Sequence, residues 1–125
     1  MSDARYLVDT NILVYLLAGA AEPLRRRMEL RAPGSVVTSV LCACEAMVGA
    51  RRNEQEIVLG RLLDVIEPLP FDMVAAAAFV ALPFRRGKLD RWIAAHALSL
   101  DLTLVTNNER DFADIPDLRI ENWTL

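Results

Sequence analysis

The sequence contains few residues of the kinds that staple small proteins together or bind soft metals. Among its 125 residues are only two cysteines and one histidine. Cys42 and Cys44 stand too close in the chain for an ordinary disulfide, and a structural zinc site needs about four Cys or His ligands. We therefore expect neither disulfides nor a zinc centre. We interpret both cysteines as small buried residues in a reducing cytoplasm.

No apolar run is long enough to cross a membrane. The longest uncharged apolar runs, residues 12–21 and 73–82, are about half the roughly 20 residues that a bilayer requires. The N-terminus also lacks the basic flank, the apolar run and the cleavage site of a secretory signal. The sequence therefore predicts a cytoplasmic protein that does not use a membrane.

The excess of basic charge that is typical of proteins coating nucleic acids is missing as well. The chain has 14 Lys and Arg against 17 Asp and Glu, a formal net charge of −3. This balance argues against non-specific coating of DNA, but it allows an enzyme with acids in its site and arginines around it. With a hydrophobic fraction of 54%, the chain can bury one core, and we expect a single domain over residues 1–125.

Short strand-like segments alternate with helix-like segments along the chain. Strands are expected at residues 6–8, 35–38, 66–69, 102–105 and 118–120, and helices at 12–20, 23–31, 40–52, 54–65, 73–82 and 89–100. This alternation predicts an α/β fold in which helices cover both faces of a parallel sheet. In such folds the active site lies beyond the carboxyl ends of the strands, so the residues that follow each strand are the first candidates.

Three carboxylates stand in unusually apolar surroundings. Asp9 is the only charge within residues 6–17, Glu45 is the only charge within residues 40–50, and Asp90 opens a largely apolar helix. A buried carboxylate is costly unless it is paired, hydrogen-bonded or bound to a metal. Asp9 and Asp90 could instead be helix caps. Glu45 lies in mid-helix where no cap is needed, so a functional role is favoured over an ion pair with an arginine.

Two further segments lie close to these acids. The polar loop 106–112 follows a strong strand and places Asp111 at the same predicted edge, although an ordinary Asn-rich turn would look similar. Arg85, Arg86 and Lys88 precede Asp90, and such cations suit contact with phosphate or with a protein partner, the alternative being a solvated face. His96 lies too far round its helix from Asp90 to share its face, and we interpret it as structural.

Taken in order, these segments resemble PIN domains, and in particular VapC-type toxin ribonucleases. The matching segments are residues 7–13, 38–39 with Glu45, 90–97, 105–108 with 111–112, and 118–123, which together cover nearly the whole chain. The resemblance implies a PIN-like three-layer α/β/α sandwich with a central, mainly parallel sheet of four to five strands.

The resemblance also implies an activity: a metal-dependent endoribonuclease that acts as the toxin of a toxin–antitoxin pair. By resemblance, the catalytic residues and the ligands of Mg²⁺, or of Mn²⁺ as a substitute, are Asp9, Glu45, Asp90 and Asp111. Such a metal would activate water for hydrolysis of RNA phosphodiester bonds. The implied partners are an RNA substrate, a cognate antitoxin protein and a second copy of the chain in a homodimer.

The match departs from the family at two places. Asn11 and Thr106 match polar positions that support the acids, but Asn108 stands where many PIN domains carry another acid. The stretch between Asp72 and Asp90 is also shorter than the family leads us to expect. Both departures favour one alternative, a PIN-like module that binds RNA or a partner but has weakened catalysis.

Two readings outside the family fit the sequence less well. A phosphoreceiver domain needs a lysine after a late strand, whereas the only lysine, Lys88, precedes a helix. A two-carboxylate phosphatase needs a second Asp two residues after Asp9, where Asn11 stands.

Overall fold

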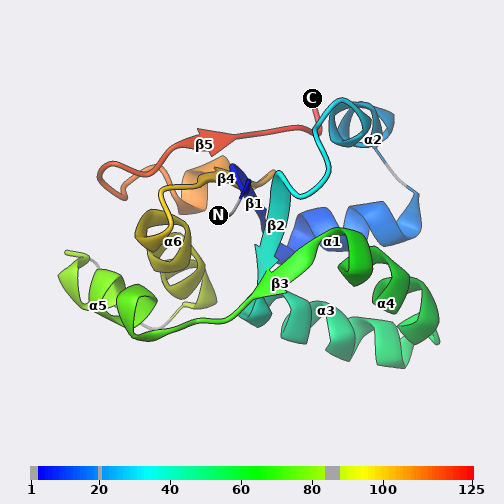
Figure 1. Cartoon of the computed structure of the whole chain (residues 1–125), viewed down its shortest axis with the longest axis horizontal. Helices are drawn as coiled ribbons and strands as arrows, with labels where there is room; N and C mark the ends of the chain where they lie inside the picture. Colours follow the sequence, from blue (N-terminus) through cyan, green and yellow to red (C-terminus); the bar gives the residue numbers. More distant parts are fainter. Residues whose placement is uncertain (1–2, 20, 84–87) are drawn as a thin grey trace.

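The computed structural model describes residues 3–19, 21–83 and 88–125, and a five-stranded sheet runs through its centre (Figure 1). The strands are β1 (Tyr6–Val8), β2 (Val36–Ser39), β3 (Glu67–Leu69), β4 (Thr103–Val105) and β5 (Ile120–Glu121). The helices are α1 (Thr10–Ala18), α2 (Glu22–Glu29), α3 (Val40–Arg52), α4 (Glu56–Val65), α5 (Met73–Ala81) and α6 (Leu89–Ser99), with a short 3-10 helix, η1 (Glu109–Asp111). Every strand and helix expected from the sequence has a counterpart here, with ends shifted by a few residues.

All four strand pairings are parallel, and the strand order is β3-β2-β1-β4-β5. The chain first moves outward from β1 to β3 through α1 to α4, and it then returns through α5 and α6 to β4 on the other side of β1. Because parallel crossovers are right-handed, this reversal places α1, α3 and α4 together on one face and α5 and α6 on the other (Figure 1). The predicted α/β fold is confirmed.

The central strands are covered on both faces. Leu7 and Val8 in β1 and Leu104 and Val105 in β4 are fully buried, as expected for parallel strands that read as continuous apolar runs. Trp123, near the end of the chain, is also fully buried. The sheet is therefore a rigid base, and residues at its carboxyl edge are held in fixed positions.

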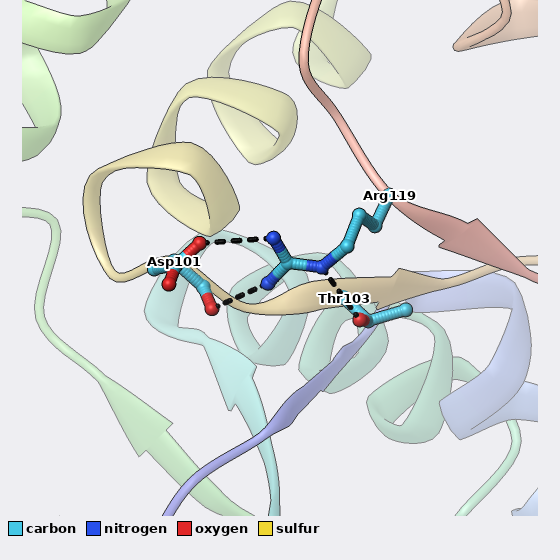
Figure 2. A network of polar contacts seen from close by, with 3 residues as sticks. All are labelled: Asp101, Thr103 and Arg119. Carbon is cyan, nitrogen blue, oxygen red and sulfur yellow. Dashed lines mark hydrogen bonds and ion pairs between the residues drawn. The ribbon is translucent and has the colours of Figure 1, made fainter.

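The amino edge of β4 is tied to the segment that leads into β5 (Figure 2). The Arg119 guanidinium donates to the Asp101 carboxylate at 3.0 Å and to the Asp101 carbonyl oxygen at 2.8 Å. Its Nε donates to the Thr103 hydroxyl at 3.4 Å. These bonds fix the end of the long β4–β5 connection at the sheet edge opposite to the predicted active site.

Within the described part of the chain, no helix is both long and apolar enough to span a bilayer. The cytoplasmic location stays a prediction.

Candidate active site

Asp9 lies at the point where the winding of the sheet reverses. It directly follows β1, and its backbone N–H donates to the carbonyl of Val105 at the end of the neighbouring β4. One oxygen of its carboxylate, Oδ1, accepts the Ile12 N–H at 3.1 Å and so caps α1. The side chain is only 6% exposed. Asp9 is therefore a helix cap, which was one of the two roles considered from the sequence. The cap also holds the carboxylate at the switch point, the place where the strand order of the sheet reverses and where ligands bind in open α/β sheets.

Thr106 supports this carboxylate from the end of β4. It is fully buried, its hydroxyl is hydrogen-bonded to Asp9, and the same oxygen accepts the N–H of Asn108 at 3.0 Å. The Thr106 oxygen accepts from the Asn108 N–H, so the Thr106 hydroxyl can use its own hydrogen to donate to the Asp9 carboxylate. Thr106 therefore orients Asp9 and fixes the start of the polar loop.

Electrostatic interactions of Asp9 and Asp90 link the four predicted acids: Asp9 interacts with Asp90 and Glu45, and Asp90 interacts with Glu45 and Asp111. Burial raises the pKa of Asp9, and repulsion from Asp90 and Glu45 raises it further, against the lowering effect of its hydrogen bonds. Burial, followed by repulsion from Asp111, likewise raises the pKa of Asp90. One negative cluster is thus assembled from the end of β1, from α3, from α6 and from η1 after β4. Its catalytic role stays a prediction.

Three local expectations were wrong. Glu45 is exposed, although the residues around it in the sequence are apolar. Asp90 does not cap α6, because Lys88 occupies the N-cap position and Asp90 lies in the first turn. Cys44 is also exposed, whereas Cys42 is buried and its thiol has a pKa raised by burial to about 12. Glu45 therefore belongs to the solvent side of the cluster.

The asparagine side chains near the acids belong to two separate hydrogen-bonded groups. The amide of Asn11 donates to Asn107 Oδ1 at 3.4 Å, and the Asn107 amide donates to the Tyr15 hydroxyl at 2.8 Å. The amide of Asn108 donates to Asp111 Oδ2 at 3.0 Å. An ionised acid at position 108 could not donate this bond. Asn107 and Tyr15 were not predicted as site residues from the sequence. For Asn107 the only signal was its place in the Asn-rich loop after β4, and for Tyr15 there was none.

Of the predicted basic contacts, only Lys88 can be placed. It is exposed, and its charge acts on Asp90 by lowering the pKa of that carboxyl against the larger effect of burial. Arg85 and Arg86 lie outside the described residues.

The donor set fits a hard divalent cation. All four side chains offer carboxylate oxygen, which Mg²⁺ and Mn²⁺ prefer, and a cation would relieve the repulsion that raises the pKa of Asp9 and Asp90. In residues 3–19, 21–83 and 88–125, no three His, Cys, Asp or Glu side chains are close enough to hold one ion jointly. A magnesium site that uses one or two carboxylates directly and keeps several waters does not require three such side chains.

A buried polar link lies between the elements that carry the acids. His96 is 1% exposed, and its Nδ1 lies 2.8 Å from the hydroxyl of Ser39, which also accepts the N–H of Leu41 at the start of α3. The ring also bonds to the carbonyl of Pro70, which can only accept. Burial lowers the pKa of His96 and so favours the neutral imidazole, and we assign the tautomer in which the ring donates to Pro70 and accepts from Ser39. The structural interpretation of this histidine agrees with its burial and bonding.

We expect Ser39→Ala to destabilise the fold by about 1–3 kcal/mol, because it removes a helix cap and leaves a buried imidazole nitrogen without a donor. Urea denaturation measures the change, with Ser99→Ala as the control. Ser99 donates to the His96 carbonyl oxygen at 2.7 Å on the more exposed side of α6. A cost for Ser39→Ala no larger than that of the control would contradict the interpretation.

Comparison with known proteins finds a matching family model and relatives of similar length. A family model described as PIN domain matches residues 6–118. The chain is 30% identical over 130 residues to a Salmonella typhimurium protein named tRNA(fMet)-specific endonuclease VapC, a match that covers 95% of this chain and 98% of the relative. It is 32% identical over 130 residues to Ribonuclease VapC2 of Haemophilus influenzae, with coverage of 95% and 98%.

Solved structures resemble it over similar lengths. The crystal structure of DNA-bound VapBC from Salmonella typhimurium superposes with a TM-score of 0.86 at 28% identity, covering 96% of this chain and 98% of that one. The structure of VapBC2 from Rickettsia felis, bound to a DNA fragment from their promoter, gives a TM-score of 0.81 at 27% identity, with coverage of 94% and 98%.

Proposed function

The chain belongs to the PIN domain family, and we propose that it is an endoribonuclease, the toxin of a toxin–antitoxin pair. Relatives of nearly the same length carry the names endonuclease or ribonuclease VapC, and the similar structures are VapBC complexes. The observation that carries the proposal is the cluster of four carboxylates, with Asp9 at the switch point of the sheet. The proposal treats residues 1–125 as one PIN-like domain.

In this proposal, carboxylate side chains would hold the divalent cation, and a threonine hydroxyl orients one of them. Asp9 and Asp90, whose carboxyl pKa values are raised by burial, would hold the divalent cation, with Glu45 and Asp111 completing the negative surface around it. When bound, the cation supplies the activated water and the charge stabilisation that phosphodiester hydrolysis needs. Thr106 keeps Asp9 in a fixed orientation through its hydroxyl.

We assign Mg²⁺ as the metal, with Mn²⁺ as a substitute. The site offers oxygen donors only, because His96 is committed to Ser39 and Pro70 and Cys42 is a buried thiol with a high pKa. Soft ligands that would select zinc or copper are therefore not offered by these residues.

The proposed partners are an RNA substrate, a cognate antitoxin and a second copy of this chain. RNA phosphates would approach the cluster past Lys88, which is exposed beside Asp90. An apolar groove of about 480 Å³ between α3 and α4, lined by Met47, Val48 and Leu63 among others, offers a surface for a protein partner. Several large apolar side chains elsewhere are also exposed, including Met73 and Val80 on α5.

A catalytically weakened PIN-like binding module is the second candidate. Position 108 favours this candidate, because many PIN domains carry another acid there. In this chain the position is Asn108, and its neutral amide donates to Asp111. This alternative predicts binding of RNA or antitoxin without metal-dependent cleavage.

The test is incubation of antitoxin-free protein with total cellular RNA in Mg²⁺, in Mn²⁺ and in EDTA. We expect discrete fragments in either metal and none in EDTA. If a folded protein cuts no RNA but still binds it with a saturable isotherm, the result contradicts the ribonuclease and favours the binding module. Cleavage that is equally fast in EDTA would contradict the metal site.

A further inference from the structure

A cavity of about 580 Å³ lies at the amino edge of the sheet, at the opposite end of β1 from Asp9. It is lined by the segment that leads into β1 and by the loop that joins α2 to β2, and its charged lining residues are Asp3, Arg5 and Arg31. Its volume falls within the range of roughly 300–1,000 Å³ that is typical of small-molecule sites. The proposed ribonuclease mechanism does not use this end of the sheet.

Arg31 is held beside the cavity by two aromatic rings. The central carbon of its guanidinium lies 4.9 Å from the centre of the Tyr6 ring and 5.0 Å from that of the Trp123 ring. Its Nη1 donates to the Tyr6 hydroxyl at 3.3 Å, and the two rings pack edge to face with centroids 4.9 Å apart. Because Trp123 is fully buried, the rings restrict the orientation of the guanidinium.

The charge of Arg31 has no carboxylate partner among the described residues. Arg31 is partly buried, and its Nε is enclosed without a hydrogen-bond partner in the part of the chain that the structure describes. Neither Arg31 nor Arg5 forms an ion pair with an acid of residues 3–19, 21–83 or 88–125. Removing a guanidinium from water is costly, and aromatic rings offset only part of that cost. A negatively charged ligand would supply the missing counter-charge.

A third arginine at the same edge has the counter-charge that Arg31 lacks. Arg119 is more exposed than Arg31, yet its guanidinium donates to the carboxylate and to the carbonyl oxygen of Asp101 (Figure 2). These two residues line a smaller cavity of about 280 Å³, which shares Arg5 and Tyr6 with the first. Asp101 thus neutralises the more exposed arginine and not the two that line the larger cavity.

The walls of the larger cavity are fixed by hydrogen bonds to the backbone. The N–H groups of Arg5 and Tyr6 both donate to the carbonyl oxygen of Ser35, at 2.8 and 3.0 Å. The Ser35 hydroxyl donates to the Ala32 carbonyl oxygen at 2.7 Å and so closes the turn before β2. Little of the backbone around the cavity must therefore be ordered when a ligand binds, which lowers the cost of binding.

We propose that this cavity binds the phosphate group of a small ligand, with Arg31 as the anchor and Arg5 as the second cation. Arg31 Nη2 forms no hydrogen bond with the described residues and, unlike Nε, is not enclosed, so its hydrogens are available to an oxyanion. Phosphate has acceptor oxygens in several directions and can meet cations from two elements, whereas a carboxylate has only two oxygens. Asp3 is the one acid among the described lining residues, so two arginines leave an excess of positive charge.

Inorganic phosphate is the probe, because it carries the recognised group alone. We expect the wild type to bind it at one site, and Arg31→Gln to weaken the affinity at least about tenfold, the loss expected for a charge-assisted hydrogen bond. Arg5→Gln should weaken it by a smaller factor, because Arg5 is exposed. Arg61→Gln is the charge-matched control, since Arg61 is exposed on α4, away from the residues that line the cavity, and its loss should leave the affinity unchanged.

The experiment is a calorimetric titration of the full chain with sodium phosphate in EDTA, with the ionic strength held constant by sodium chloride. EDTA removes divalent metal, so phosphate cannot bind through an ion at the carboxylate cluster. Sodium acetate is titrated in parallel to separate phosphate from carboxylate. Melting curves verify that each variant is folded. Arg31→Lys replaces Arg31→Gln if the latter does not fold, and it should also weaken binding, because lysine keeps the charge but lacks the planar fork.

The inference goes beyond the ribonuclease proposal and does not depend on it, since the titration requires neither RNA nor metal. Saturable phosphate binding that Arg31→Gln weakens and Arg61→Gln retains would support the site. If the wild type binds no phosphate, or if both variants are affected alike, the site is wrong and the guanidinium is held by Tyr6 and Trp123 alone. Tighter binding of acetate than of phosphate would contradict phosphate as the recognised group.

Discussion

Asp9→Asn is expected to lower the rate of metal-dependent RNA cleavage by at least about 100-fold, since loss of a mere outer partner of a metal site costs up to about that much. The substitution removes one negative charge from the cluster but keeps the size of the side chain. Asparagine also remains a good helix cap, so the bond from the Ile12 N–H is retained. Single-turnover cleavage of RNA in saturating Mg²⁺ measures the effect.

Asp72→Asn is the matched control for this substitution. Asp72 caps α5 in the same way, accepting the Ala75 N–H at 3.0 Å, but it is not among the acids of the cluster. We expect its cleavage rate to stay within about twofold of the wild type, since a cap exchange between Asp and Asn is nearly neutral. Equal losses in both variants would show that Asp9 acts only as a cap.

The stability of metal-free Asp9→Asn provides a second check. Because burial raises the pKa of Asp9 above its ordinary value of 3.8, the unfolded chain releases the proton more readily than the folded one. The carboxyl therefore supports the fold fully below pH 3.8, and this support is lost as the pH rises through the raised folded value. At pH 7 without metal, the variant should melt at a higher temperature than the wild type, and the difference should shrink toward pH 3.8.

Phe112→Ala is expected to give the largest loss of stability, about 3–5 kcal/mol. Its ring is 1% exposed and lies in the core, so the substitution leaves a buried cavity beneath the β4–β5 connection. Because Asp111 directly precedes it, cleavage should also fall at temperatures where the variant remains folded. Guanidinium denaturation monitored by circular dichroism measures the first effect.

Phe79→Ala is the comparison for this prediction. Phe79 is only partly buried and stacks on the half-exposed Trp92 with ring centroids 3.9 Å apart. Its loss leaves a gap that solvent can fill, so its cost should be clearly smaller. A larger cost for Phe79→Ala would mean that the β4–β5 connection is not anchored through Phe112.

The general plan of the fold could be predicted from the sequence because it depends on local patterns. Apolar runs such as that of β1, followed by a capping Asp9 and an apolar helix, specify strand and helix without reference to distant residues. Ser39 and Asp72 likewise cap the helices that directly follow them. Parallel pairing then follows, because strands joined by helices must run in the same direction.

The environment of single residues was less predictable. Glu45 has apolar neighbours along the chain, yet it is exposed because α3 also turns Met47 and Val48 to solvent, at 54% and 52% exposure. Local apolarity identifies burial only when the apolar side chains face the core. On a helix with an exposed apolar face, that inference fails.

The sequence by itself determined the order of the elements and the presence of acids near strand ends, since both depend only on residues that are neighbours in the chain. Only the tertiary structure decided which side chains meet: Ser39 with His96, Asn107 with Tyr15, and Arg91 with Asp114. These pairs are separated by between 23 and 92 residues. Hydrogen bonds and ion pairs depend on distances of about 3 Å, and such distances are set by how helices pack on the sheet. No pattern of neighbouring residues encodes that packing.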